Sequence, residues 1–212
     1  MIFSIFALPL KVTMPNSEGN SIIRITDSRY LDEIVALHID AFRNVFSGQI
    51  GGIFLRYYYR SIFEKGMVYG KITNGRLSGF IAGIVDDRLL YDIKYYFWAA
   101  FGLLTHVCSP AVIRSLFRHF KRLQAFRDVI IIPELLSIAV RDDMRGKGIG
   151  TELINVLDNY FREKHIPFYK VYTDMLYSTG SQLYEKLGFE LFREVDLYGL
   201  PFRLYVKDLK FK

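Results

Sequence analysis

Apolar residues recur along the chain at two spacings, every second residue and every third or fourth, and segments of the two kinds follow one another. SIIRIT, at 21–26, alternates like a strand, and a stripe from Leu31 to Val45 has the spacing of a helix with one buried face. Asp27 and Ser28 lie between them and are residue types that cap helices. The chain is therefore predicted to begin its fold with a strand and a helix.

A second helix, rich in aromatic residues, is predicted over 53–63. The next segment, MVYGKITNGRLSGFIAGIV, has the pattern of two strands joined at Asn74-Gly75. This pair of residues favours the tight turn of a β-hairpin. A hairpin is therefore predicted directly after the second helix.

The same alternation of elements resumes after residue 127. IIPELLSIAV predicts a strand, YKVYTD another, and SQLYEKL a short helix that ends at Gly188, a suitable left-handed cap. FELFREVDLYGLPFRLYVKDL predicts a final hairpin turning near 199–201. Between the first two of these strands, an apolar stripe of helical period comprises Ile149, Leu153, Val156, Leu157, Tyr160 and Phe161. The order of elements predicts an α/β (α+β) domain on a mixed sheet.

Residues 88–127 interrupt this order with a mostly helical insertion. Its aromatic cluster, which could line an acceptor pocket, consists of Tyr95, Tyr96, Phe97 and Trp98. Its cations recur on one helix face at i, i+4, i+7 and i+8: Arg114, Arg118, Lys121 and Arg122. A solvated face, an anionic acceptor such as a nucleotide-linked amino sugar, and docking on a membrane surface are the interpretations that this pattern leaves open.

Two apolar runs have features of targeting or membrane segments. The first ten residues have no positive region and no small-residue cleavage site, so we expect residues 1–20 to form a loosely ordered leader and 21–212 a single domain. The run 95–113 has the length of a membrane span, but Thr105, His106, Ser109 and Pro110 interrupt it. A membrane-spanning helix is therefore disfavoured.

Composition narrows the function classes. Apolar residues make up 51% of the chain, which suffices for a core, and the formal net charge of +6 is moderate. Cys108 is the only cysteine, which excludes an internal disulfide and a cysteine zinc cluster and favours a reducing, cytoplasmic compartment. No His/Cys/Asp spacing indicates a metal. The basic helix is not interleaved with aromatic residues on a strand platform, so nucleic-acid binding is disfavoured.

A glycine-rich segment, MRGKGIGTELINVL at 144–157, joins a predicted strand to a predicted helix. Such a turn exposes N–H groups at the positive end of a helix, and its glycines let the backbone approach phosphates. The spacing matches neither a Walker loop nor a G-x-G-x-x-G dinucleotide fingerprint. A pyrophosphate cradle is predicted, with a plain tight turn as the alternative. The glycines are Gly146, Gly148 and Gly150, and the rim cations are Arg145 and Lys147.

The segment LLSIAVRDDMRGKGIGTELINVL resembles the acetyl-CoA-binding segment of the GNAT superfamily of N-acetyltransferases, whose pattern is Arg/Gln-x-x-Gly-x-Gly/Ala after the fourth strand. LYEKLGFE, at 183–190, is similar to that family's second signature, with Tyr184 followed by Gly188-Phe189. The resemblance implies a GNAT-type mixed, mainly antiparallel central sheet flanked by helices. The helical insertion at 88–127 falls between the third and fourth strands of such a sheet, and the resemblance says nothing about it.

By this resemblance, acetyl-CoA is the co-substrate, no metal takes part, and the cofactor lies between the fourth and fifth strands. It would hydrogen-bond strand backbone at Ile138 and Val140. Its pyrophosphate would lie on Arg145, Gly146, Lys147, Gly148, Ile149, Gly150 and Thr151. Family members usually carry an asparagine at the start of the short helix, where this chain has Ser178, which has a shorter reach.

Acetyl transfer to an amine requires an unprotonated nucleophile, stabilisation of the oxyanion and a proton for the leaving thiolate. The resemblance implies Tyr184 as the general acid; an aromatic side chain packed before Gly188 is the alternative. Asp142 and Asp143 are expected to cap the turn. His38 is expected to be a packed core histidine.

Glu134 begins the predicted fourth strand, where many family members hold a base, and a surface carboxylate is the equally weighted alternative. On strict alternation it shares a face with Leu136, Ile138 and Val140. A bulge in this strand would alter that phase.

Together these features predict an acyl-CoA-dependent N-acetyltransferase that moves an acetyl group to a primary amine of a small molecule, an amino sugar being one candidate. A non-catalytic acyl-CoA-binding or membrane-associated interaction protein on the same fold is the alternative. The expected partner is the amine acceptor; a membrane surface is less favoured, and a homodimer is compatible with either hypothesis.

Overall fold

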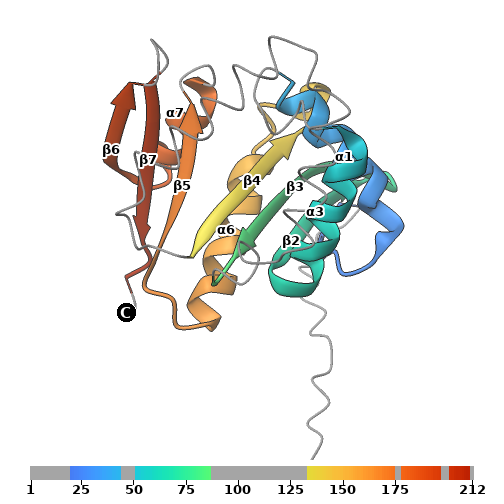
Figure 1. Cartoon of the computed structure of the whole chain (residues 1–212), viewed down its shortest axis with the longest axis horizontal. Helices are drawn as coiled ribbons and strands as arrows, with labels where there is room; N and C mark the ends of the chain where they lie inside the picture. Colours follow the sequence, from blue (N-terminus) through green and yellow to red (C-terminus); the bar gives the residue numbers. More distant parts are fainter. Residues whose placement is uncertain (1–19, 44–50, 87–132, 175–177, 197–200, 211–212) are drawn as a thin grey trace, which may run out of the picture.

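The computed structural model describes residues 20–43, 51–86, 133–174, 178–196 and 201–210 (Figure 1). Their strands form one sheet in the order β1-β2-β3-β4-β5-β7-β6. Neighbouring strands are antiparallel except β4 and β5, which are parallel. This confirms the predicted mixed, mainly antiparallel sheet. The strands are β1 (Ser21–Arg24), β2 (Met67–Thr73), β3 (Arg76–Ile84), β4 (Glu134–Val140), β5 (Phe168–Asp174), β6 (Glu190–Asp196) and β7 (Pro201–Asp208).

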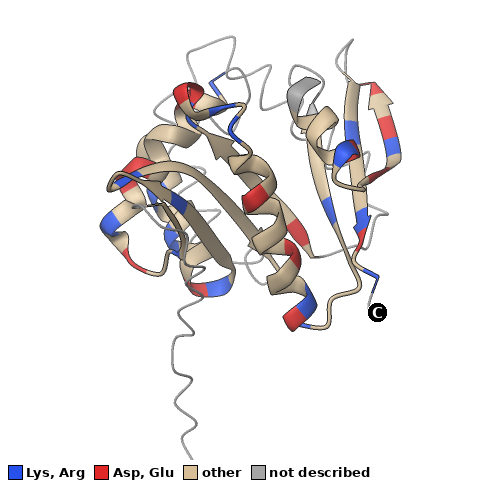
Figure 2. Cartoon of the chain, turned by 180° about the vertical axis from the view of Figure 1, so that it is seen from behind, with Lys and Arg blue, Asp and Glu red and all other residues tan. Residues whose placement is uncertain are grey.

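Helices cover both faces of this sheet. The α-helices are α1 (Leu31–Ala41), α3 (Gly52–Lys65), α6 (Ile149–Glu163) and α7 (Ser178–Lys186). α1 and α3 pack on one face and α6 on the other, as views from the two sides show (Figures 1 and 2). Basic and acidic residues alternate along the ribbon in Figure 2, in agreement with the mixed charge of the sequence.

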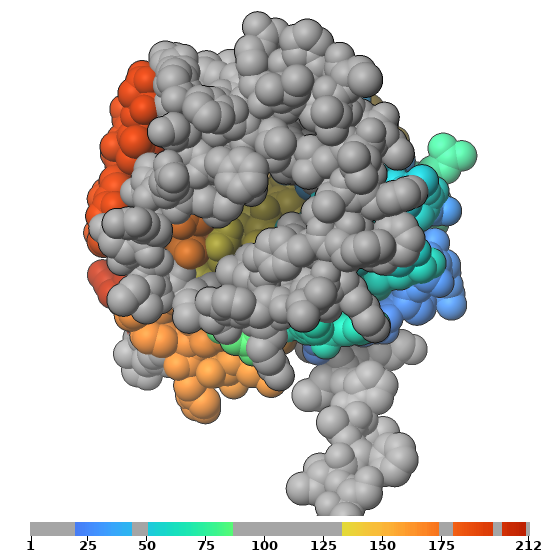
Figure 3. All heavy atoms as spheres, viewed as in Figure 1, coloured from blue at the N-terminus to red at the C-terminus, as the bar shows by residue number. Residues whose placement is uncertain are grey.

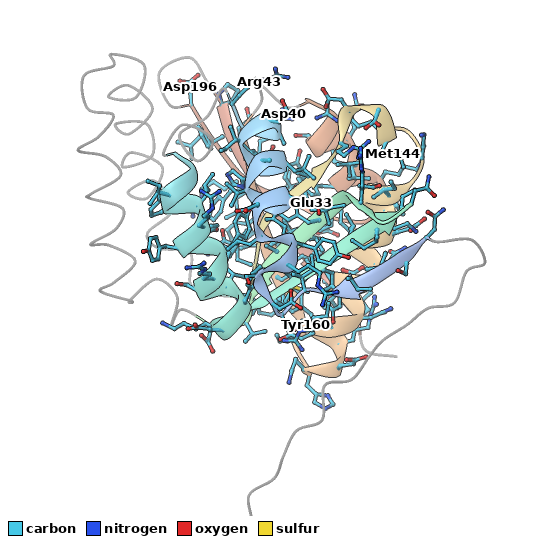
Figure 4. All side chains as sticks on the ribbon, turned by 90° about the vertical axis from the view of Figure 1, so that its right-hand side faces the viewer. Glu33, Asp40, Arg43, Met144, Tyr160 and Asp196 are labelled. Atoms are coloured by element: carbon cyan, nitrogen blue, oxygen red, sulfur yellow. The ribbon has the colours of Figure 1, made fainter. Side chains whose placement is uncertain are left out.

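The core consists of two apolar clusters, one on each face of the sheet. Alternation along β3 supplies both, because Phe80 packs with α1 and α3 whereas Ile81 packs with α6. The predicted stripe of α6 is buried, with Leu153, Leu157 and Phe161 fully inaccessible to solvent. On the other face, α1 is also tied to β3 by the Glu33 carboxylate, which accepts a hydrogen bond from the Leu77 N–H at 2.9 Å (Figure 4).

The predicted turn residues adopt the expected conformations. Asn74 and Gly75 both have positive φ, at 52° and 75°, in the turn between β2 and β3. Gly188 has φ 81° after α7, as a left-handed cap requires. The predicted final turn at 199–201 lies mostly outside the described residues, but β6 and β7 pair as the hairpin requires.

Several predictions fall on residues that the structure does not describe. They are the leader and the 88–127 insertion, with its aromatic cluster (Tyr95, Tyr96, Phe97, Trp98), its cations (Arg114, Arg118, Lys121, Arg122) and Cys108. In the described part of the chain, every helix is too short or too polar to span a membrane.

Strict alternation does not hold along β4, because the strand contains a bulge. Ser137 pairs with Ala82 of β3 and Leu135 with Gly83, so Leu136 has no opposite residue. Leu136 packs on the α1/α3 face, while Ile138 and Val140 pack on the α6 face. The shared face expected from strict alternation is therefore wrong, and the bulge is the cause.

Three buried tyrosines are expected to make the free energy of unfolding depend on pH in the alkaline range. Burial raises the pKa of Tyr59, Tyr169 and Tyr184 above the ordinary value of 10.0. The folded state keeps protons that the unfolded state releases above pH 10.0, so this stability is complete below that pH and is lost above it. We expect a loss of about 1.4 kcal/mol per pH unit for each tyrosine. Urea unfolding at a series of alkaline pH values tests this; a flat profile above pH 10.0 would contradict it.

Candidate functional site

The parallel strands β4 and β5 pair at one end and separate at the other. Pairing is confined to Glu134 with Lys170 and Leu135 with Val171, next to a hydrogen bond from the Lys170 N–H to the Pro133 carbonyl at 3.0 Å. Beyond Leu135 the two strands open. Figure 3 shows yellow and orange atoms of this region of the sheet from the side viewed in Figure 1.

The backbone of β4 presents N–H groups to this opening. The N–H of Arg141 donates to the Ser78 carbonyl of β3 at 2.9 Å. Because backbone groups alternate in direction along a strand, the N–H groups of Val140 and Ile138 point away from β3. The β4–β5 ladder ends before either residue. Two N–H donors therefore face the opening, with one residue between them.

At the open end of β4 the chain enters the glycine-rich loop and α6. Gly146 and Gly148 have φ 75° and 81°, a conformation that side chains disfavour, and Gly148 is the N-cap of α6. The Glu152 N–H donates to the Gly148 carbonyl at 3.0 Å, so the N–H groups that precede it form the free end of the helix. The loop thus has the backbone form of an anion cradle at a helix N-terminus.

The other loop residues have distinct surroundings. The side chain of Ile149 is 4% exposed and belongs to the core, so only its backbone can contact a ligand. A Cβ on Gly150 would lie 3.1 Å from Leu183 Cδ2 of α7, so the two helices approach closely at this glycine. Thr151 is half-buried in the first turn of α6. Ser178 is the first residue of α7, and its side chain lies outside the described part.

The charged side chains of the loop are exposed. Arg145 forms an ion pair with Asp142 at 2.8 Å, and Lys147 Nζ lies 3.4 Å from Met144 Sδ, with Met144 at the start of the loop (Figure 4). Asp143 pairs with Arg141, whose hydrogen bond lowers the pKa of that carboxyl. Both aspartates thus pair with arginines of the turn, whereas their predicted capping role stays a prediction. The two rim cations remain accessible to a phosphate.

Tyr184 lies in α7, packed against aromatic rings. It is 5% exposed, with its ring centroid 5.1 Å from that of Phe189 and 6.0 Å from that of Tyr205. Burial raises the pKa of its hydroxyl, so the phenol stays protonated at neutral pH. A protonated phenol is the state that a general acid requires.

Glu134 lies at the closed end of the opening. Its carboxylate is 3.5 Å from Lys170 Nζ, and that ammonium group is 5.2 Å from the centre of the Tyr172 ring. The side chains of Glu134 and Lys170 are 19% and 11% exposed. Glu134 is thus a partly buried, paired carboxylate rather than an isolated surface charge, and the opening extends from it to the glycine loop.

Sequence reasoning missed two polar residues, Ser137 in β4 and Tyr59 in α3, which packs against this side of the sheet. His38 is buried as expected, but its Nδ1 lies 2.6 Å from the hydroxyl of Tyr59, which in turn lies 3.0 Å from Ser137 Oγ. A serine inside the apolar run LLSIAV was the available signal. The tyrosine was hidden among the aromatic residues of its helix.

Two further features bear on ligand binding. Among the described residues, no three His, Cys, Asp or Glu side chains are grouped to hold a metal. A pocket of about 600 Å³ lies between β1, β2 and α6, lined in part by Tyr69, Asn155 and Tyr160. None of the predicted site residues lines it.

Comparison with known proteins agrees with this geometry. Residues 113–191, which include the glycine loop and Tyr184, match the family model described as the acetyltransferase (GNAT) domain. This segment of the chain is similar to the GNAT acetyltransferase domain. No curated protein matches its sequence. The GNAT match extends to residue 191 and so contains both signatures, the cradle and the tyrosine helix.

Solved structures share the GNAT fold with this chain. An N-acetyltransferase from Staphylococcus aureus Mu50 is 19% identical, with a TM-score of 0.61 over 91% of this chain and 100% of its own. The ribosomal-protein-S18-alanine N-acetyltransferase from Escherichia coli is 14% identical, with a TM-score of 0.57 over 91% and 96%. A GNAT family acetyltransferase from Elizabethkingia anophelis, with acetyl-CoA bound, is 14% identical, with a TM-score of 0.53 over 91% and 99%. At these identities the likeness establishes the fold.

Proposed function

We propose that this protein is an acetyl-CoA-dependent N-acetyltransferase that acetylates a primary amine of a small molecule. The observation that carries the proposal is the alignment of two features: the opening between β4 and β5, and the glycine cradle at the N-terminus of α6. Together they form one continuous path with backbone donors along its side and cations at its end. The acetyl-CoA bound to the GNAT structure from Elizabethkingia anophelis supports this choice of cofactor.

Each part of the path suits one part of acetyl-CoA. The helix N-terminus and the loop N–H groups would hold the pyrophosphate, with Arg145 and Lys147 at the rim. The N–H groups of Val140 and Ile138 would bind the pantetheine arm and polarise the thioester carbonyl. Ser178, the first residue of α7, would take the place of the family's asparagine.

The reaction is a direct attack in which the amine nitrogen bonds to the carbonyl carbon and the C–S bond breaks. The nitrogen loses one proton, for which Glu134, directly or through water, is the proposed base. The thiolate gains one proton, for which Tyr184 is the proposed donor. Atoms and charges balance with the acetylated amine and free CoA as products.

Tyr184→Phe tests the chemical step. Removing the hydroxyl leaves the ring packing intact, so we expect acetyl-CoA affinity to be unchanged and turnover to fall about 100-fold. Release of free thiol is measured against a panel of primary amines that includes amino sugars. Tyr160→Phe is the matched control, because Tyr160 lines the pocket by β1 and β2 and not the opening.

The same assay separates the two candidate functions. An enzyme releases thiol with at least one amine and loses rate in Tyr184→Phe. A non-catalytic acyl-CoA-binding protein binds acetyl-CoA, releases no thiol with any amine and is indifferent to the substitution. Undiminished turnover in Tyr184→Phe would remove this residue from the mechanism.

A further inference from the structure

Three buried polar side chains from three elements form a hydrogen-bonded chain that ends on β4. His38 of α1, Tyr59 of α3 and Ser137 of β4 are 3%, 0% and 5% exposed. The Nδ1–Oη and Oη–Oγ distances are 2.6 and 3.0 Å. Polar groups are costly to bury, so such a chain inside an apolar cluster requires an explanation.

The middle member of this chain is held rigidly. The ring of Tyr59 makes edge contacts with Phe80 and Tyr58, at centroid distances of 5.5 and 5.2 Å. Burial raises the pKa of its hydroxyl, so the proton stays on the oxygen. The Tyr59 hydroxyl can accept a hydrogen bond from Ser137 Oγ and donate its own proton to His38 Nδ1, so one hydroxyl serves both partners. The hydroxyl of Tyr59 is therefore a fixed anchor on the side of β4 that faces α3.

The last member of the chain sits directly after the bulge of β4. Leu136 is the residue without a partner on β3, Ser137 follows it, and Ile138 is next. The bulge shifts the alternation of the strand by one residue. If Leu136 entered the ladder instead, the N–H of Ile138 would turn toward β3 and away from the opening. The direction of this donor thus depends on which register the strand holds.

We propose that His38, Tyr59 and Ser137 are positioning residues that hold the β4 bulge and so aim the Ile138 N–H at the thioester carbonyl of acetyl-CoA. This inference rests on the proposed function, because it assigns that carbonyl to the opening. The hydrogen bond from Ser137 ties the strand to a rigid ring on one side, and the donor on the next residue emerges on the other.

The role proposed for these three residues can be measured as the ratio of acetyl-CoA affinity to CoA affinity. A purely structural role would not change this ratio. CoA has the same pyrophosphate as acetyl-CoA but no thioester carbonyl. The wild-type protein should prefer acetyl-CoA to CoA by about tenfold, the worth of one hydrogen bond. Tyr59→Phe and Ser137→Ala should reduce this ratio toward one without weakening CoA. Ser137→Thr keeps the hydroxyl and should restore the preference.

The experiment is a calorimetric titration of each full-length variant with acetyl-CoA and, separately, with CoA. Tyr169→Phe is the matched control, because it also removes a buried hydroxyl, one that donates to Asp158 at 2.7 Å between α6 and β5. Its ratio should equal that of the wild type. If Tyr59→Phe does not fold, Ser137→Ala, a smaller change, carries the test.

The outcomes separate the inference from the proposed function. A wild-type preference that survives in both Tyr59→Phe and Ser137→Ala overturns the inference and leaves the function standing. A wild-type protein that binds the two cofactors equally also overturns it, because there is then no carbonyl contact to position. A wild-type protein that binds neither overturns the proposed function itself.

Discussion

Substitution of Gly148 by glutamate is expected to weaken acetyl-CoA binding by about 100-fold or more. The residue has φ 81°, where a side chain costs roughly 1–2 kcal/mol of backbone strain. The new carboxylate would also stand at the N-terminus of α6, where it competes with the pyrophosphate for the same N–H groups and repels it. Isothermal calorimetry with acetyl-CoA measures the loss.

Gly75→Glu is the matched control for this substitution. Gly75 has φ 75° and, like Gly148, has open space where a Cβ would be placed. It lies in the turn between β2 and β3, outside the glycine loop and the N-terminus of α6. The two variants should therefore carry similar strain but differ in binding. Equal affinity in both would show that the loop is only a turn.

Asp158→Ala is expected to destabilise the protein by about 3–5 kcal/mol, the cost of leaving one member of a buried ion pair without its partner. Asp158 is 4% exposed and accepts hydrogen bonds from Lys207 Nζ at 2.6 Å and from the Tyr169 hydroxyl at 2.7 Å. These contacts tie α6 to β5, which borders the opening, and to the neighbouring strand β7. Urea unfolding followed by circular dichroism measures the change.

Asp32→Ala is the control, because Asp32 also pairs with a cation, Arg56 at 2.8 Å, but its side chain is 76% exposed. Ion pairs on the surface contribute little to the free energy of unfolding, so the urea midpoint of Asp32→Ala should stay close to that of the wild type. Asp158→Asn is the informative intermediate: it keeps an acceptor for Tyr169 but leaves the Lys207 charge uncompensated. A change below about 1 kcal/mol in Asp158→Ala would contradict the importance of this pair.

The order of elements and most turns could be predicted from the sequence because they depend on local patterns. The apolar stripe of α6 and the Asn74-Gly75 turn are both short-range signals, and both are confirmed. The bulge in β4 is different, since it is defined by the loss of one pairing partner on β3. The alternation of residues within one strand carries no information about pairing with the neighbouring strand. The sheet face on which each β4 side chain lies could therefore be assigned only from the structure.

The candidate site divides in the same way. The glycine loop is local, and its positive φ angles follow from residue type. The contact from His38 through Tyr59 to Ser137 spans 21 and then 78 residues of sequence, so no spacing rule could reveal it. The catalytic roles of Tyr184 and Glu134 stay predictions, as does the division of the chain at residue 20. The acceptor-binding residues proposed in the insertion lie outside the described structure.

The most direct test of the account is a calorimetric titration of the wild-type protein with acetyl-CoA, run beside dephospho-CoA and ATP. The account predicts saturable binding with one molecule of acetyl-CoA per chain, because the chain presents one opening aligned with one cradle among its described residues. The absence of both a heat of binding and a thermal stabilisation by acetyl-CoA would contradict the account. That result would favour an interaction protein on the GNAT fold.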